Sequence, residues 1–199
     1  MMLIEETAVP LSALPMAEFK AHLRLGTGFS DGEVQDPVLE GFLRAAIAAI
    51  EGRTGKVLIA RAFSWTIWRW SAPDRQPLPV APVSAVTALI LRNPAVGQEV
   101  IAPELYWLEQ DTHRPALRPR GALLPAIPSG GTAEVDFDAG MAADWGGLPA
   151  DLGQAVLLLA AHYHEYRHET ALGGGCMPFG VSSLIERYRN VRILGGGQA

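Results

Sequence analysis

Hydrophobic spacing in the first 56 residues predicts helices separated by a glycine-rich break. Residues 11–23 carry leucines and a phenylalanine near helical spacing, which predicts a short first helix. Asp36-Pro37 is typical of a helix start, because Asp can cap free N–H groups and Pro is tolerated in the first turn. The segment that follows has an apolar stripe on one face and ends at Gly52 to Gly55, which predicts a second, longer helix.

From residue 57 the pattern becomes that of short strands. The segment 63–70 is aromatic and β-branched with partial alternation, and most of the 15 prolines lie between 73 and 128. Proline is confined to the edges and turns of sheets, so stiff loops should join these strands. We predict strands over residues 63–70, 83–91, 105–109, 113–120 and 132–137.

A helical pattern returns at Leu148-Pro149 and ends before Gly173 to Gly175. We therefore predict an α+β fold, in which a small helical core of about three helices carries an inserted antiparallel β region and a mobile C-terminal tail. The expected parts are the N-terminal helices of the core (1–56), the inserted β region (57–147), a core helix (148–172), and a hinge with the tail (173–199).

Composition narrows the class of protein. Hydrophobic residues make up 49% of the chain and charged residues only 19%, against about 25% charged in ordinary globular proteins. Disorder throughout is excluded, because it requires few apolar residues and high net charge. The apolar excess suggests burial against other subunits. No membrane span is expected, because the longest apolar run, 155–161, is far shorter than the roughly 20 residues that a bilayer requires.

Charge and cysteine content exclude further classes. The net charge of −5 disfavours tight binding to phosphate backbones, which needs neutralising Lys and Arg. Cys176 is the only cysteine, so no intrachain disulfide can form. Residues 1–6 lack the basic and apolar segments of a signal peptide, and we expect the protein to fold in a cytoplasm.

The most enzyme-like pattern is the H-E-x-x-H string from His164 to His168. In zinc peptidases this spacing places two imidazoles on one helical face, and the Glu, here Glu165, activates a metal-bound water. The extended form of the motif fails, because Ala171 and Gly174 occupy the positions of its Gly and third His. We favour a polar helix end without metal, and keep a zinc-dependent hydrolase as the alternative.

Three other patterns have structural interpretations. Glu134, Asp136 and Asp138 alternate on a predicted strand, where a solvated face is favoured over a cation site. The tryptophans within 65–70 could stack on bases, but they fit a core or subunit interface better. No phosphate-cradling glycine motif occurs. No catalytic residue, metal site or cofactor is therefore expected.

Six weak patterns, taken in order, resemble a known family. The chain is similar to the head–tail connector (adaptor) proteins of long-tailed bacteriophages, including versions carried by prophages and gene transfer agents. The resemblance spans nearly the whole chain and rests on order and spacing rather than on one motif. The patterns lie in residues 18–25, 50–56, 78–83, 135–140, 162–167 and 177–189.

The resemblance implies a structural adaptor and not an enzyme. Adaptors form a ring, usually twelve-fold, that docks beneath the portal of a DNA-filled capsid and extends the DNA channel toward the next connector or tail component. The implied partners are further copies of the chain, the portal protein and that downstream component, with DNA only passing through. The implied location is the head–tail junction of a virion or phage-like particle assembled in a bacterial cytoplasm.

The resemblance also implies that the C-terminal segment, here residues 177–193, clasps the portal. Deleting residues 177–199 is then expected to leave the helical core folded and to abolish docking. A third possibility is a small DNA-binding accessory protein that uses the arginines of this segment, although the acidic chain favours a protein partner. The residues predicted to bind the portal are Phe179, Val181, Leu184, Ile185, Arg187, Tyr188, Arg189, Val191 and Arg192.

Overall fold

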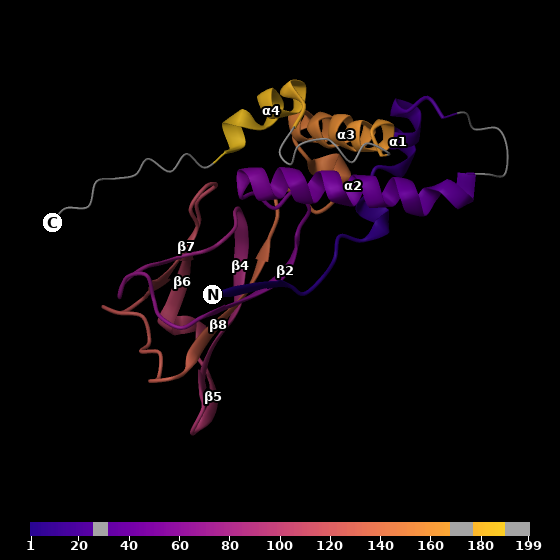
Figure 1. The fold of residues 1–199 in the computed structure, drawn as a ribbon. Coiled ribbons are helices and arrows are strands. Elements are labelled where there is room, and N and C mark those ends of the chain that lie inside the picture. The colour runs from indigo at the N-terminus through magenta and orange to yellow at the C-terminus, as the bar shows by residue number, and fades with distance from the viewer. Residues whose placement is uncertain (26–31, 168–176, 190–199) are drawn as a thin grey trace.

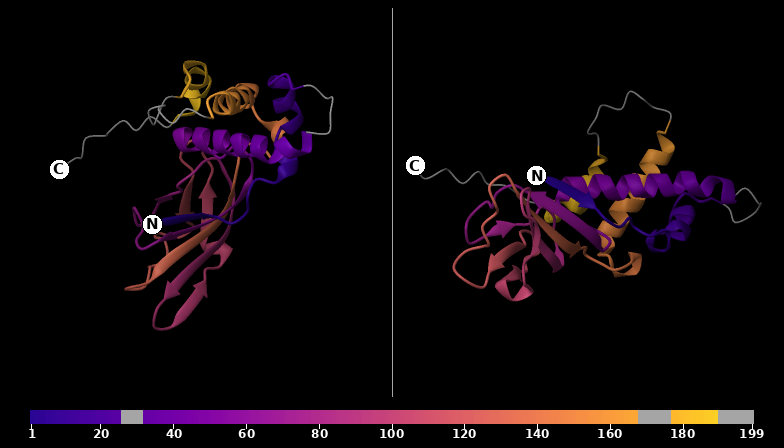
Figure 2. Two further views of the ribbon diagram at one scale, coloured as in Figure 1. Left: turned by 45° about the vertical axis from the view of Figure 1, so that its right-hand side comes forward. Right: turned by 90° about the horizontal axis from the view of Figure 1, so that it is seen from below.

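The computed structural model describes residues 1–25, 32–167 and 177–189 of the 199-residue chain. A layer of helices lies on one end of a β region, with α2 between the strands and the other helices (Figure 1, Figure 2). The predicted α+β class, with helices flanking an antiparallel region in the sequence, is confirmed. The helices are α1 (Met16–His22), α2 (Gly32–Thr54), α3 (Ala150–Glu165) and α4 (Phe179–Ile185).

One apolar cluster holds the helical layer together. Phe19 of α1, Leu43 and Ile50 of α2, and Leu159 of α3 are almost fully buried in it. Two of these positions, 43 and 50, lie on the stripe that helical spacing predicts. Burial of such side chains contributes about 1.5–3 kcal/mol each, which stabilises α1 despite its short length.

The start of α2 differs from the prediction. The helix begins at Gly32, and Pro37 lies inside it rather than at its first position. Asp36 does not cap the helix; its carboxylate forms an ion pair with Lys20 of α1 at 2.5 Å. Pro37 lies beyond the first four residues, whose N–H groups have no partner within the helix, so it removes one hydrogen bond from the second turn of α2.

The β region consists of two antiparallel sheets. The five-stranded sheet has the order β1-β2-β8-β4-β5, and the three-stranded sheet has the order β3-β7-β6. The first contains β1 (Met2–Glu5), β2 (Arg61–Ile67), β8 (Thr132–Ala139), β4 (Val83–Asn93) and β5 (Gly97–Val100). The second contains β3 (Gln76–Pro77), β7 (Ala116–Pro119) and β6 (Tyr106–Glu109).

A second apolar cluster fills the space between these sheets. In the five-stranded sheet Trp65, Val135 and Leu89 lie opposite one another on adjacent strands, with their side chains directed inward. Tyr106 and Leu117 of the three-stranded sheet complete the cluster. Alternation of buried and half-buried positions along β8 is the pattern that predicts such a strand.

Five predicted strands are present with shifted ends, as β2, β4, β6, β7 and β8. The short strands β1, β3 and β5 were not predicted. The predicted helix over 11–23 is divided into a 3-10 turn, η1 (Leu11–Ala13), and α1. Across the described ranges no helix combines the length and the apolar content that crossing a bilayer demands.

Buried polar contacts join the two regions. Arg61 of β2 forms ion pairs with Glu51 of α2 at 2.7 Å and with Glu5 of β1 at 2.8 Å. The Nζ of Lys56 donates to the carbonyl oxygen of Thr112 at 2.5 Å. Burial lowers the pKa of the Lys56 ammonium. The Arg61–Glu51 pair, which is largely removed from water, thus ties the β region to the helical layer.

Candidate assembly surfaces

The C-terminal segment 177–189 forms α4 and a 3-10 turn, η4 (Glu186–Tyr188), which pack on α3. Val181 and Ile185 are fully buried, and Tyr188 is nearly so. All three belong to the same apolar cluster as α1, α2 and α3. Removal of residues 177–199 would therefore uncover the core, so the expectation that the deletion leaves this core intact is corrected.

The other predicted portal-binding residues that the structure describes are less buried. Phe179 is 87% exposed, and Leu184 is half-buried. Arg187 and Arg189 are exposed, and Arg189 forms an ion pair with Glu186 at 3.0 Å. Val191, Arg192 and the glycine hinge at 173–175 lie outside the described residues.

A polar network fastens the end of this segment to α3. The Tyr188 hydroxyl donates to the Asp151 carboxylate at 2.9 Å, and Arg187 forms an ion pair with the same carboxylate at 2.9 Å. The guanidinium of Arg187 also lies over the Tyr188 ring, 4.7 Å from its centre. Burial raises the pKa of the Tyr188 hydroxyl. One carboxylate near the start of α3 thus holds both residues.

The structure gives His164 of the H-E-x-x-H string a packing role. Its ring meets Phe42 of α2 edge to face, with 5.8 Å between ring centres. Burial, with a smaller effect of the Arg167 charge, lowers the pKa of the His164 imidazole. Glu165 is exposed, and His168 lies outside the described residues. Among the residues described, no group of three or more metal-ligating side chains converges.

The carboxylates of β8 occupy the outer face of the five-stranded sheet. Glu134 accepts both hydrogen bonds of a bidentate pair with Arg92, at 2.8 and 2.9 Å. The Oδ1 of Asp136 is buried and has no hydrogen-bond partner among the described residues. This face is therefore half-buried, where a solvated face was expected.

The three tryptophans of the aromatic segment have different environments. Trp65 is buried between the sheets, whereas Trp68 is 58% exposed beyond the end of β2. Trp70 is half-buried and donates from Nε1 to the carbonyl oxygen of Pro125 at 2.8 Å. The expectation of a core or interface role is therefore correct for the core at Trp65, and Trp68 remains available for a contact.

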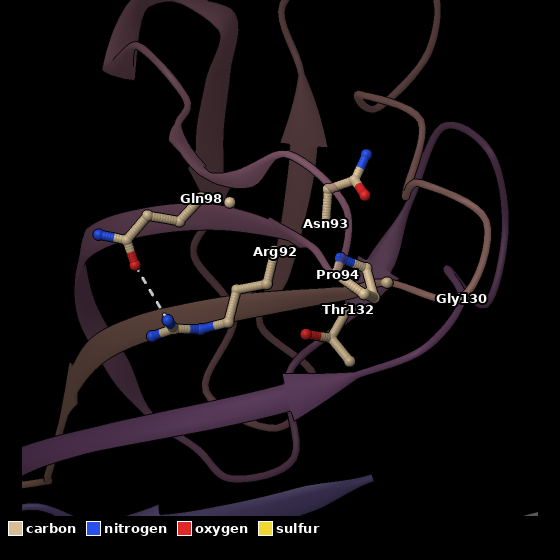
Figure 3. A pocket seen from close by; sticks show the side chains of 8 residues that line it. Arg92, Asn93, Pro94, Gln98, Gly130 and Thr132 are labelled. Atoms are coloured by element: carbon tan, nitrogen blue, oxygen red, sulfur yellow. Dashed lines mark hydrogen bonds between the residues drawn. The ribbon is translucent and has the colours of Figure 1, made fainter.

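An open hollow of about 410 Å³ lies beside the turn of the β4–β5 hairpin (Figure 3). Its one cation, Arg92, is already engaged by Glu134 and by Gln98 at 2.9 Å. A guanidinium so occupied leaves little capacity for an anionic ligand. We therefore interpret the hollow as an irregularity of the protein surface rather than as a small-molecule binding site. Its lining residues are Arg92, Asn93, Pro94, Gly97, Gln98, Gly130, Gly131 and Thr132.

A second hollow, of about 330 Å³, lies on the three-stranded sheet beside Trp107. The carboxylate of Glu109 accepts from Arg118 at 2.6 Å and from Arg75 at 3.2 Å, which holds its pKa below the usual range. Leu105, two residues before Trp107, is also exposed. An exposed tryptophan beside fixed arginines is typical of protein interfaces. The sequence alone does not reveal this site, because Trp107 and Arg118 meet only through the pairing of β6 with β7.

Three solved structures that resemble this chain come from gene transfer agent particles. The neck of an empty GTA particle computed with C6 symmetry contains a chain 55% identical, with TM-score 0.89. The virion of a native gene transfer agent (GTA) particle contains one 55% identical, with TM-score 0.86. The neck of a native GTA particle computed with C12 symmetry contains one 51% identical, with TM-score 0.84. Each match covers 98% of this chain and 99% of the other.

No family model matches the chain, and no curated protein matches it.

Proposed function

Because the chain belongs to the head–tail connector (adaptor) family found in the necks of gene transfer agent particles, we propose that twelve copies form a ring that joins the portal to the next tail component. The connector role, the ring and the location at the head–tail junction follow from the neck structures. The observation that carries the proposal is sequence identity of 51–55% over 98% of the chain.

The exposed part of the C-terminal segment is proposed to contact the portal. Phe179 provides an apolar anchor and Arg189 a charge, both on the outside of the helical layer. Val181, Ile185 and Tyr188 support them from beneath, because their burial in the core fixes the position of α4 and η4. This division gives the docking segment a rigid base, which reduces the entropy lost on binding.

The opposite end of the molecule is proposed to face the downstream component. In Figure 1 β5 lies far from α4, at the lower end of the β region, and β6 lies beside β7 between these two ends. Trp107 and the arginines around Glu109 lie on the three-stranded sheet of the same β region. If α4 contacts the portal, this end points away from it.

The proposed ring is structural and not catalytic, and DNA passes through it without being held. A net charge of −5 repels phosphate rather than neutralising it. The packing of His164 against Phe42 supports a non-enzymatic helix end over a zinc hydrolase. The acidic balance equally disfavours the DNA-binding accessory protein.

Native mass spectrometry of the chain with its portal protein tests the proposal. The expected product contains one copy of this chain per portal subunit. We expect Phe179→Asp and Arg189→Glu to weaken the complex at least tenfold, whereas the exposed Ser183→Ala should bind as the wild type does. Equal binding by all variants would contradict the docking segment, and a wild-type chain that ignores the portal would contradict the portal as partner.

A further inference from the structure

The five-stranded sheet ends in two open edges, β1 on one side and β5 on the other. All four residues of each strand are exposed; Ile4 is 42% and Val100 64% exposed. An edge strand presents unpaired N–H and C=O groups, and proteins usually protect it with lysine, proline or a bulge. β1 has none of these, and three of its four residues are apolar.

The hydrogen bonds beside the two strands define which backbone groups face outward. Glu6 donates to the carbonyl of Ala62 at 2.9 Å, and Ile101 donates to that of Leu89 at 2.8 Å. In an antiparallel ladder, residues that bond to the neighbouring strand alternate with residues whose peptide groups face away from it. The residue immediately before each donor, and the residue two positions before that one, therefore turn their N–H and C=O groups outward. These residues are Leu3 and Glu5 in β1, and Gln98 and Val100 in β5.

Strand direction limits how two copies can join these edges. In a sheet of five antiparallel strands, β1 and β5 run in the same direction. Rotation about a ring axis keeps each strand's inclination to that axis, and neighbouring subunits of a twelve-fold ring differ by only a small turn. β5 of one copy would therefore meet β1 of the next as a nearly parallel pair. Two different edges at opposite ends of one sheet form a head-to-tail contact, which can close into a ring with no edge left over.

We propose that β1 of each subunit adds to β5 of its neighbour, so that the sheets become continuous around the ring. The proposal rests on the ring of the proposed function and names its subunit contact. In the register that uses all the outward groups of β5, the N–H of Leu3 donates to the carbonyl oxygen of Gln98 in the neighbour. The carbonyl oxygen of Leu3 accepts from the N–H of Val100 in the same neighbour. Ile4 then lies opposite Val100, and both side chains project from the outer face of the sheet.

Cysteine pairs tested in purified particles would detect this contact. In a Cys176→Ser background, Ile4→Cys with Val100→Cys should give a ladder of covalent oligomers on a non-reducing gel after mild oxidation. The control pair, Ile4→Cys with Glu99→Cys, places the second thiol on the opposite face and should crosslink at least fivefold less. A chain present in the neck at normal copy number without a ladder would overturn the edge pairing and leave the connector role intact.

Val100→Pro provides a second test that does not depend on thiol chemistry. The substitution removes an outward N–H, whereas the adjacent residues Glu99 and Ile101 make the bonds to β4. We expect a folded chain with an unchanged circular dichroism spectrum and at least a tenfold loss of rings by native mass spectrometry. Normal rings from this variant would overturn the proposal, and a wild-type chain that is absent from the neck would instead contradict the proposed function.

Discussion

The helical layer and the β region each bury a separate apolar cluster, but they differ in how completely their outer elements are covered. In the helical layer even the C-terminal segment completes the core, through Val181 and Ile185. In the β region the five-stranded sheet stops at two open edges, and Trp107 is left exposed. The helical layer therefore closes its own core, whereas the β region leaves edge strands that the proposed subunit contact would cover.

The largest loss of stability is expected when the ion pair between the helical layer and the β region is broken. Arg61→Met leaves Glu51 buried without its cation, and breaking a buried ion pair costs about 3–5 kcal/mol. Denaturant unfolding should show this loss, with the single transition broadening or dividing in two. Arg92→Met removes a pair whose arginine side chain is 47% exposed, and should cost less than about 1 kcal/mol. Equal losses in the two variants would show that the junction is not the critical contact.

A matched pair in α4 tests whether the docking segment is part of the core. Ile185→Ala should lower the free energy of unfolding by about 2–5 kcal/mol, because it opens a cavity in the helical cluster. Phe179→Ala, six residues earlier on the exposed side, should change it by less than about 0.5 kcal/mol. Urea titrations of both variants provide the measurement. A small effect at Ile185 would mean that α4 does not rest on α3 in solution.

Substitution of Gly140, which lies against Ala60, should cause a smaller loss of stability. A Cβ on Gly140 would lie 2.2 Å from the Cα of Ala60, so the backbone of one segment must shift. We expect Gly140→Ala to cost about 1–3 kcal/mol, as overpacking does. Gly121→Ala, where the added Cβ meets open space, is the control and should be close to neutral. Thermal unfolding of the two variants shows whether the backbone at Gly140 and Ala60 can shift to accommodate the added methyl group.

The smallest expected effect is a dependence of stability on pH, which arises from His164 in the helical layer. The pKa of His164 is lowered by burial, so below about pH 6.5 the unfolded chain binds more protons at this residue than the folded chain does. Stability should therefore fall as the pH falls from 7 to 5. His164→Gln should reduce that fall, by no more than about 2 °C in Tm, and the same change at exposed His22 serves as control. A drop in Tm on adding a chelator to the wild type would favour the zinc interpretation instead.

Sequence patterns predicted the elements that bury one face against a core. The alternation along β8 and the apolar stripe of α2 were visible because burial imposes a period on the sequence. The strands β1 and β5 left no such period, since all their side chains are exposed. β1 pairs with β2, which is distant in the chain and which local spacing cannot show, whereas β5 is the short return strand of a hairpin with β4.

The docking residues were predicted as a set, but only their chemical types could be derived from the sequence. Helical spacing over 179–188 does not reveal which side of α4 meets α3, because both sides carry apolar residues. The structure separates buried Val181 from exposed Phe179. The start of α2 was misplaced for a related reason: Asp36 pairs with Lys20, a contact across two helices, instead of capping its own.

The position of β1 at the extreme amino end has a practical consequence for purification. A fusion tag placed before Met1 would emerge from an open sheet edge, and one placed after Ala199 would follow the proposed docking segment. Either could block assembly while leaving each chain folded, and would give a misleadingly monomeric preparation. A short epitope inserted at the exposed turn of Ser129 and Gly130 would leave both ends of the chain native.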